Sequence, residues 1–155
     1  MAEFIDVNTG EVEVSSQPVV LRAMAIGSCV VVVAFDRGRK MGGLAHIMLP
    51  GRAPEREDKD KAKYTEDAID ELLIKLKNLG VKREDLEISV VGGADLLGES
   101  SISELIASSV LDYLRSLGIE PRQQSLGGTQ RRSVSFGIGS GKILYTEGDS
   151  QEKEL

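Results

Sequence analysis

The chain has 155 residues, of which 41% are hydrophobic and 4% aromatic, and its formal net charge is −6. These values fit one globular domain, and they exclude a disordered chain and a basic, aromatic surface for nucleic acid. The single cysteine cannot form an internal disulfide, and no apolar run approaches the roughly 20 residues that span a bilayer. Because the first residues are acidic where a signal peptide is basic, we expect a cytoplasmic protein without direct membrane insertion.

The first part of the chain is expected to form β-strands. Residues 1–17 are polar, so we take them as a flexible segment and begin the folded domain at Pro18. One strand then leads to a turn at Gly27, and a second runs from about Cys29 to Phe35 through four consecutive valines, which favour a strand covered on both faces. The turn sequence DRGRK and the apolar LAHIML follow. Since no helix fits between them, these two strands are predicted to form an antiparallel hairpin.

Two helices are predicted after this hairpin. The first covers residues 65–79, with Thr65 as its expected cap, and a buried strand, EISVVGG, follows it. The second begins near Ser101, where a capping-box spacing occurs, and ends at Gly118. The helices end alike, as KLKNLGV and YLRSLGI, and each leads to a Gly-Gly pair. This similarity hints at a duplicated helix–strand unit.

The remaining segments set the boundaries of the domain. The charged residues 50–63 form a loop that is either a lid or binding element, or a solvated insertion. RSVSFGI and KILYT are the last predicted strands. The domain is therefore expected over residues 18–146, followed by a disordered tail over 147–155.

Neither a nucleotide site nor a metal site is expected. GIGSGK, at residues 137–142, superficially resembles a phosphate loop, but KILYT follows it where a helix is required, so we interpret it as a hairpin turn. A catalytic zinc site usually needs three protein ligands, and no carboxylate is spaced with the single cysteine or the single histidine in a ligand pattern.

The single cysteine and the single histidine are the candidate catalytic pair. If Arg37 and Gly38 form a two-residue turn, Cys29 lies directly opposite His46 across the hairpin. Directly opposed Cβ atoms are about 4.5–5.5 Å apart, close to the reach of a thiol–imidazole hydrogen bond. A three-residue loop would instead put the two side chains on opposite faces.

Such a pair suits acyl transfer on an amide or ester. The imidazole takes the thiol proton, and the imidazolium then stabilises the thiolate. We expect a bend at Gly27 and Ser28 to aim backbone N–H groups at a developing oxyanion. The alternative is structural, because free cysteines are often buried as small hydrophobic residues.

Several motifs carry a resemblance to a known family. GSCV, AHIMLP, KYTEDAIDELL, VVGGADLL and LGGTQRRSV, in this order, resemble the CheD family of chemoreceptor glutamine deamidases over about residues 18–146. The resemblance implies an α+β fold of packed mixed β-sheets with flanking helices, similar to the catalytic domain of a deamidating bacterial toxin. It also implies hydrolysis of receptor glutamines to glutamate and ammonia, with Cys29 as nucleophile, His46 as base and no cofactor.

The resemblance further implies partners and contacts. The substrate would be a chemoreceptor cytoplasmic domain, and a CheC-type phosphatase would be a regulator. The candidate substrate or partner contacts lie within the shared motifs and are Tyr64, Gly92, Gly93, Gly128, Thr129 and Arg132.

The chain departs from the family pattern in three places. Ala23 stands where the family usually has a threonine that orients the histidine, so we expect His46 to be held by a backbone carbonyl or another side chain. Thr129 replaces an asparagine, and a glycine–asparagine pattern is missing from ISELIASSV. The alternatives are therefore a weak or inactive adaptor that binds a CheC-type partner or receptor, and a different amidase or esterase.

Overall fold

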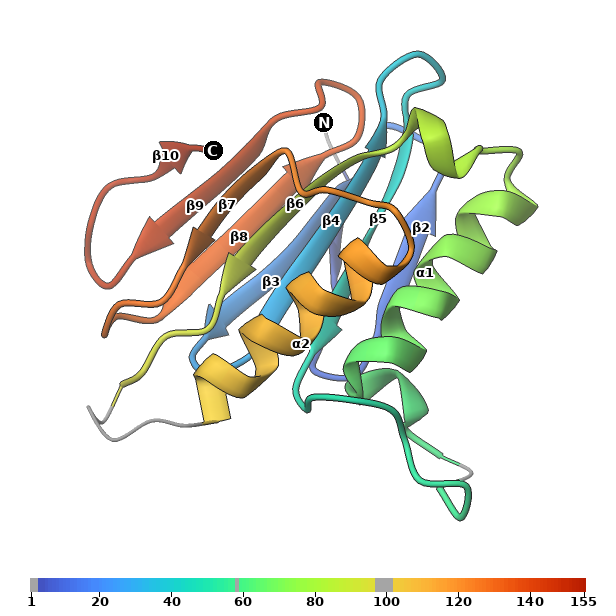
Figure 1. Ribbon diagram of the computed structural model, residues 1–155. Coiled ribbons are helices and arrows are strands. Elements are labelled where there is room, and N and C mark those ends of the chain that lie inside the picture. The colour runs from blue at the N-terminus through green and yellow to red at the C-terminus, as the bar shows by residue number, and fades with distance from the viewer. Residues whose placement is uncertain (1–2, 58, 97–101) are drawn as a thin grey trace.

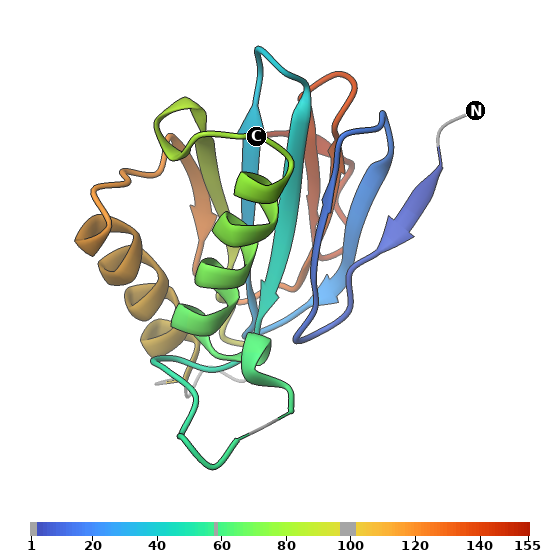
Figure 2. The same cartoon turned by 90° about the vertical axis from the view of Figure 1, so that its right-hand side faces the viewer.

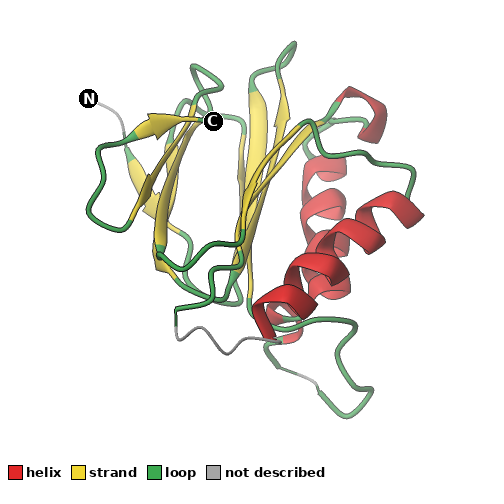
Figure 3. Cartoon of the chain, turned by 60° about the vertical axis from the view of Figure 1, so that its left-hand side comes forward, coloured by secondary structure: helices red, strands yellow, loops and turns green. Residues whose placement is uncertain are grey.

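The computed structural model describes residues 3–57, 59–96 and 102–155, and it shows an α+β fold (Figure 1). Two mixed five-stranded sheets pack face to face, and both α-helices cover the outer face of one sheet (Figure 3). The prediction of packed mixed sheets with flanking helices is confirmed. Among the described residues, neither helix is long and apolar enough to cross a bilayer.

The helix-covered sheet has a strand at its centre that is buried along its whole length. The strand order is β2 (Val12–Ser15), β5 (Met41–Ile47), β4 (Val30–Asp36), β6 (Glu87–Gly92) and β7 (Gln123–Leu126). In β4, Val30 and Val32 face the helices, whereas Val31 and Val33 face the other sheet. The valine run is therefore covered on both faces, as predicted.

The second sheet closes the core from the other side. Its order is β1 (Phe4–Asp6), β3 (Val20–Ile26), β8 (Arg132–Gly137), β9 (Ile143–Glu147) and β10 (Lys153–Glu154). Phe136 of β8 meets Phe35 of β4 edge to face, with ring centroids 5.6 Å apart. Residues 138–142 form the turn between β8 and β9, so the reading of GIGSGK as a hairpin turn is confirmed.

The two helices lie on the outer face of the first sheet, as Figure 1 shows. They are α1 (Thr65–Asn78) and α2 (Ile102–Ser116), accompanied by the short 3₁₀ turns η1 (Lys61–Lys63) and η2 (Arg83–Asp85). The predicted cap of α1 is wrong, because Tyr64 occupies the N-cap position and the Thr65 hydroxyl donates to the Leu49 carbonyl at 2.9 Å. The expected capping box at Ser101 lies outside the described residues.

The antiparallel β4–β5 hairpin is confirmed, but its predicted turn is wrong. Asp36 pairs with Met41, so four residues form the loop instead of two. The Asp36 carboxylate closes this loop by accepting the Arg39 backbone N–H at 3.0 Å and the Arg39 guanidinium at 2.9 Å. His46 consequently lies opposite Val31 and not opposite Cys29, which comes two residues earlier in the sequence. A displacement of two keeps Cys29 and His46 on the same face.

The terminal segments contribute strands of their own. β1 pairs in parallel with β3, β2 pairs antiparallel with β5, and β10 pairs with β9. Residues 1–17 therefore supply one strand to each sheet, and the structured part of the chain begins before Pro18 and extends beyond residue 146. The flexibility expected for 1–17 and 147–155 remains a prediction.

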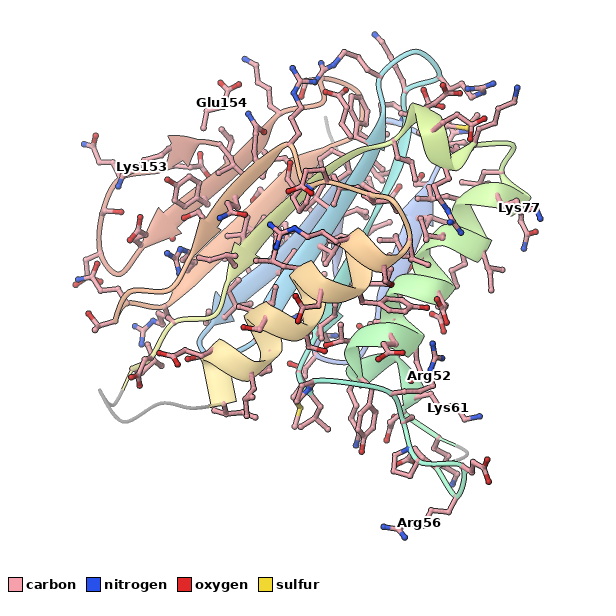
Figure 4. The ribbon with its side chains drawn as sticks, viewed as in Figure 1. Arg52, Arg56, Lys61, Lys77, Lys153 and Glu154 are labelled. Carbon is pink, nitrogen blue, oxygen red and sulfur yellow. The ribbon has the colours of Figure 1, made fainter. Side chains whose placement is uncertain are left out.

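The charged loop before α1 is tied to both helices. Arg52 pairs with Glu66 at 3.1 Å and Asp70 at 3.2 Å, and Figure 4 shows it beside the start of α1. The Gly51 N–H donates to the Ser109 hydroxyl of α2 at 2.8 Å. These contacts fix the first residues of the loop on the helical layer.

Candidate functional site

Cys29 lies in the loop that carries the chain from β3 to β4. A register shift interrupts the pairing of β3 with β8 between Ala23 and Ile26, and Ala25 has a left-handed backbone with φ of 52°. The loop is joined to the end of β6, because Gly93 N–H donates to the Cys29 carbonyl at 2.9 Å and Ala94 N–H to the Gly27 carbonyl at 3.0 Å. The thiol is half-buried at the edge of the core between the sheets.

His46 is buried, with 5% of its surface exposed. Its Nδ1 atom lies 2.9 Å from the Val7 carbonyl oxygen. A carbonyl can only accept, so Nδ1 carries the proton and Nε2 is left with a lone pair. Nε2 is buried and has no hydrogen-bond partner among the described residues. Of the two kinds of group expected to hold His46, a backbone carbonyl or a side chain, the structure shows the carbonyl of Val7.

The segment that holds this imidazole received no role in the sequence analysis. Gly10 N–H donates to the His46 carbonyl at 2.9 Å, and His46 N–H donates to the Glu11 carbonyl at 3.1 Å. Residues 7–11 therefore hold the strand that carries the base of the pair. Their polar sequence, VNTGE, gave no signal that could have marked them.

Burial favours the neutral form of both groups. It raises the pKa of the Cys29 thiol, although hydrogen bonds from Thr9 and from the Cys29 backbone oppose the increase. Burial lowers the pKa of His46, although the Val7 carbonyl and the charge of Glu11 oppose the decrease. Near neutral pH the site therefore holds a thiol and a neutral imidazole, not a preformed thiolate–imidazolium pair.

The amide groups beside the sulfur remain available to a ligand. Within the described part of the chain, the loop's backbone hydrogen bonds use the carbonyls of Gly27 and Cys29, and none uses the N–H of Gly27 or Ser28. Two N–H groups next to a nucleophile are suited to an oxyanion. Their role as oxyanion donors stays a prediction.

Two of the predicted contacts, Gly92 and Gly93, lie against the Cys29 carbonyl, and Arg132 and Gly128 are bonded to the segment around them. A Cβ on Gly92 would lie 2.3 Å from the Cys29 carbonyl oxygen. Arg132 crosses from the other sheet, where its guanidinium donates to the Gly92 carbonyl at 3.3 Å and the Gly127 carbonyl at 2.9 Å. Gly128 accepts from the Asp95 N–H at 2.8 Å. These residues support the loop around the sulfur.

The other two predicted contacts are not brought to the sulfur. Tyr64 is the N-cap of α1, and Thr129 is exposed beyond the Gly-Gly turn. Neither makes a hydrogen bond to Cys29 or His46 in the described structure. A cavity of about 540 Å³ between α1 and η2 also lies apart from the pair, and is lined in part by Leu73, Ile74 and Val81. In the three ranges that the structure covers, no three potential metal ligands cluster.

The comparisons with known proteins agree on one family. A family model described as "CheD chemotactic sensory transduction" matches residues 48–147, which begin after Cys29 and His46. The chain is 33% identical over 152 residues to the chemoreceptor glutamine deamidase CheD of Thermotoga maritima, covering 96% of each chain. It is 31% identical over 162 residues to that of Halalkalibacterium halodurans, covering all of both chains. A probable chemoreceptor glutamine deamidase CheD of Methanococcus vannielii is 32% identical over 94% of this chain and 96% of its own.

Proposed function

The chain belongs to the CheD family, and from this premise we propose that it hydrolyses glutamine side-chain amides in chemoreceptor cytoplasmic domains, giving glutamate and ammonia. The observation that supports this most is the placement of Cys29 and His46 on one face, with the basic Nε2 atom of His46 left without a partner among the described residues. A basic imidazole on the same face as a thiol supplies the two groups that nucleophilic amide hydrolysis needs.

The acylation half of the reaction uses these groups in order. His46 Nε2 takes the proton of the Cys29 thiol as the sulfur forms a bond to the glutamine carbonyl carbon. The developing oxyanion accepts hydrogen bonds from the Gly27 and Ser28 N–H groups. The imidazolium gives its proton to the departing nitrogen, the C–N bond breaks, and ammonia leaves a thioester on Cys29.

The deacylation half reverses these roles. His46 takes a proton from water as the water oxygen adds to the thioester carbonyl carbon. The C–S bond then breaks, the proton returns to the sulfur, and glutamate is released. Each proton is held by a side chain of the chain itself, so the sequence of steps needs no cofactor.

The test is direct conversion of a receptor. The full chain is incubated with the cytoplasmic fragment of a cognate chemoreceptor, and released ammonia and new glutamates are measured by mass spectrometry. We expect Cys29→Ala to abolish conversion while retaining the wild-type circular dichroism spectrum. Undiminished conversion by Cys29→Ala, or no conversion by the wild type with any cognate receptor, would reject the proposal.

A second candidate function is an adaptor that docks onto a CheC-type phosphatase or a receptor. Two features favour it: Ala23 has no hydroxyl, and burial raises the pKa of the Cys29 thiol. An adaptor would keep its partner affinity and its effect on signalling in the Cys29→Ala variant, whereas a deamidase would lose its effect.

A further inference from the structure

β3 contains a bulge just before the chain enters the loop that carries Cys29. The pairing of β3 with β8 is regular up to Ala23 and resumes at Ile26, so that two residues of β3 stand against Ser133 of β8. The loop then takes the chain from one sheet to the other, where β4 begins (Figure 2). The bulge therefore lies on the segment that delivers the nucleophile to the site.

The extra residue changes which side chains of β3 enter the core. Leu21 and Ala23 are fully buried, and the alternation of a regular strand would make Ala25 the next inward residue. Instead Ala25 is exposed, and Ile26 is buried in the core between the sheets. One added residue moves every later side chain of a strand to the opposite face, so the bulge sets the phase in which the chain enters the loop.

Ala25 holds a backbone conformation that favours glycine. Its φ of 52° lies in the left-handed region, where a Cβ atom crowds the following carbonyl oxygen. A residue keeps such a conformation only where the surrounding structure fixes it. The Ser133 hydroxyl supplies a contact of this kind, because it accepts the Ala25 N–H at 3.1 Å.

The other side of the loop is held by the end of β6. The Ala94 N–H donates to the Gly27 carbonyl at 3.0 Å, and the Gly93 N–H donates to the Cys29 carbonyl at 2.9 Å. The N–H groups beside the sulfur thus belong to a short segment that is tied to β6 and preceded by the bulge. Its geometry depends on both attachments, and the bulge is attached to the opposite sheet by the side chain of Ser133.

We propose that Ser133 is a positioning residue of the deamidation site, whose hydroxyl fixes the β3 bulge and thereby the placement of the Cys29 sulfur and of the N–H groups beside it. This inference rests on the proposed function. Ser133 acts on the backbone of Ala25, four residues before the nucleophile. A misplaced nucleophile slows the chemical step more than it weakens substrate binding, because alignment matters most in the transition state. Loss of the hydroxyl should therefore lower kcat and leave KM nearly unchanged.

The test removes the hydroxyl in two ways. Ser133→Ala deletes it, while Ser133→Val and Ser133→Thr share one shape and differ only in the hydroxyl, so their comparison stands even if Ser133→Ala folds poorly. The matched control is Ser135→Ala, because Ser135 is also half-buried and lies on the same face of β8, opposite Arg22 in the regular part of the sheet. In ammonia release from the receptor fragment, we expect kcat to fall about three- to tenfold in Ser133→Ala and Ser133→Val. Ser133→Thr and Ser135→Ala should match the wild type.

Alkylation of Cys29 reports on the loop without requiring turnover. The chain has one cysteine, so its reaction with iodoacetamide can be followed by intact mass. A loosened loop exposes the half-buried thiol, and the rate at about pH 8 should be about threefold higher in Ser133→Val than in Ser133→Thr.

The two measurements separate this inference from the proposed function. If Cys29→Ala abolishes conversion, kcat decides: equal values for Ser133→Val and Ser133→Thr, or an equal loss in Ser135→Ala, overturn the role of Ser133. If the wild type converts no receptor, or Cys29→Ala retains conversion, the proposed function fails and alkylation decides. Equal alkylation rates for Ser133→Val and Ser133→Thr then show that the hydroxyl does not position the loop.

Discussion

The Nδ1 atom of His46 donates its hydrogen to the Val7 carbonyl oxygen, 2.9 Å away, and this contact fixes the tautomer of the ring. Nε2 is then the basic atom, and it lies buried without a hydrogen-bond partner in the described part of the chain. The contact joins the linker between β1 and β2 to the end of β5, the strand that carries the base. A backbone group thus fixes the orientation of the imidazole.

The first prediction concerns the pH dependence of the thiol. Burial raises the pKa of Cys29 above its ordinary value of 9.0, so at any given pH less thiolate is present than in a free cysteine. We expect the rate of iodoacetamide labelling of the wild-type chain to keep rising above pH 9, with glutathione as the reference thiol. A plateau reached by neutral pH would instead indicate a preformed thiolate–imidazolium pair.

The second prediction concerns the acid limb of the pH–rate profile for deamidation. Burial lowers the pKa of His46 below 6.5, so the ring stays neutral and able to accept a proton at lower pH than a free imidazole. The kcat/KM for receptor deamidation should therefore begin to fall only below pH 6.5. In Glu11→Gln the neighbouring negative charge is lost, and the acid limb should move further down in pH. A limb that moves up in Glu11→Gln would contradict this assignment.

The third prediction tests how closely β6 approaches the nucleophile. In Gly92→Ala the new Cβ would meet the Cys29 carbonyl oxygen at 2.3 Å, and the backbone φ of 124° is unfavourable for alanine. We expect a loss of deamidation and a destabilisation of about 1–3 kcal/mol. Gly80→Ala is the matched control, because Gly80 also has a positive φ, 95°, but faces open space. It should lose stability and retain the alkylation profile of Cys29, whereas Gly92→Ala should change both.

The fourth prediction concerns the arginine that links the two sheets. Arg132 is 4% exposed, and it donates to two backbone carbonyls and to the Ser125 hydroxyl. Arg132→Met would remove the charged hydrogen bonds to the Gly127 carbonyl and the Ser125 hydroxyl, whereas the Gly92 carbonyl would keep the Gly127 N–H. We expect a cost of about 2–4 kcal/mol. The thermal midpoint should fall by roughly 5–15 °C. Arg131→Met changes the exposed neighbour and should leave the midpoint within about 2 °C of wild type.

The order of strands and helices could be largely predicted from local patterns. The valines of β4 and the helical periodicity of α1 report burial directly, because each residue's environment follows from its immediate neighbours. Cys29 and His46 share a face even though the predicted turn is two residues too short, because side chains along a strand alternate with a period of two. An error of one residue would have separated them.

The contribution of residues 7–11 could not be predicted in this way. Val7 acts through its carbonyl, which every residue has, on a histidine 39 positions further along the sequence. The same holds for β1 and β2, which are short strands that depend on partners distant in the chain. Such pairings are set by the tertiary fold and leave no local periodicity.

The last prediction concerns Asp36, whose side chain selects the four-residue loop and so sets the register of the hairpin. Burial alone would raise its pKa, but the Arg39 hydrogen bonds and positive charge outweigh burial and lower it below 3.8. A carboxylate with a lowered pKa stabilises the fold above its unfolded pKa, and this contribution disappears as the pH falls through the folded value. Asp36→Asn should therefore lower the free energy of unfolding by about 1–3 kcal/mol at pH 7, measured by urea denaturation. The difference from wild type should shrink below pH 4, while Asp149→Asn, at an exposed loop position, should match the wild type throughout. A penalty that is the same at pH 7 and pH 3 would show that the ionised carboxylate is not what closes the loop.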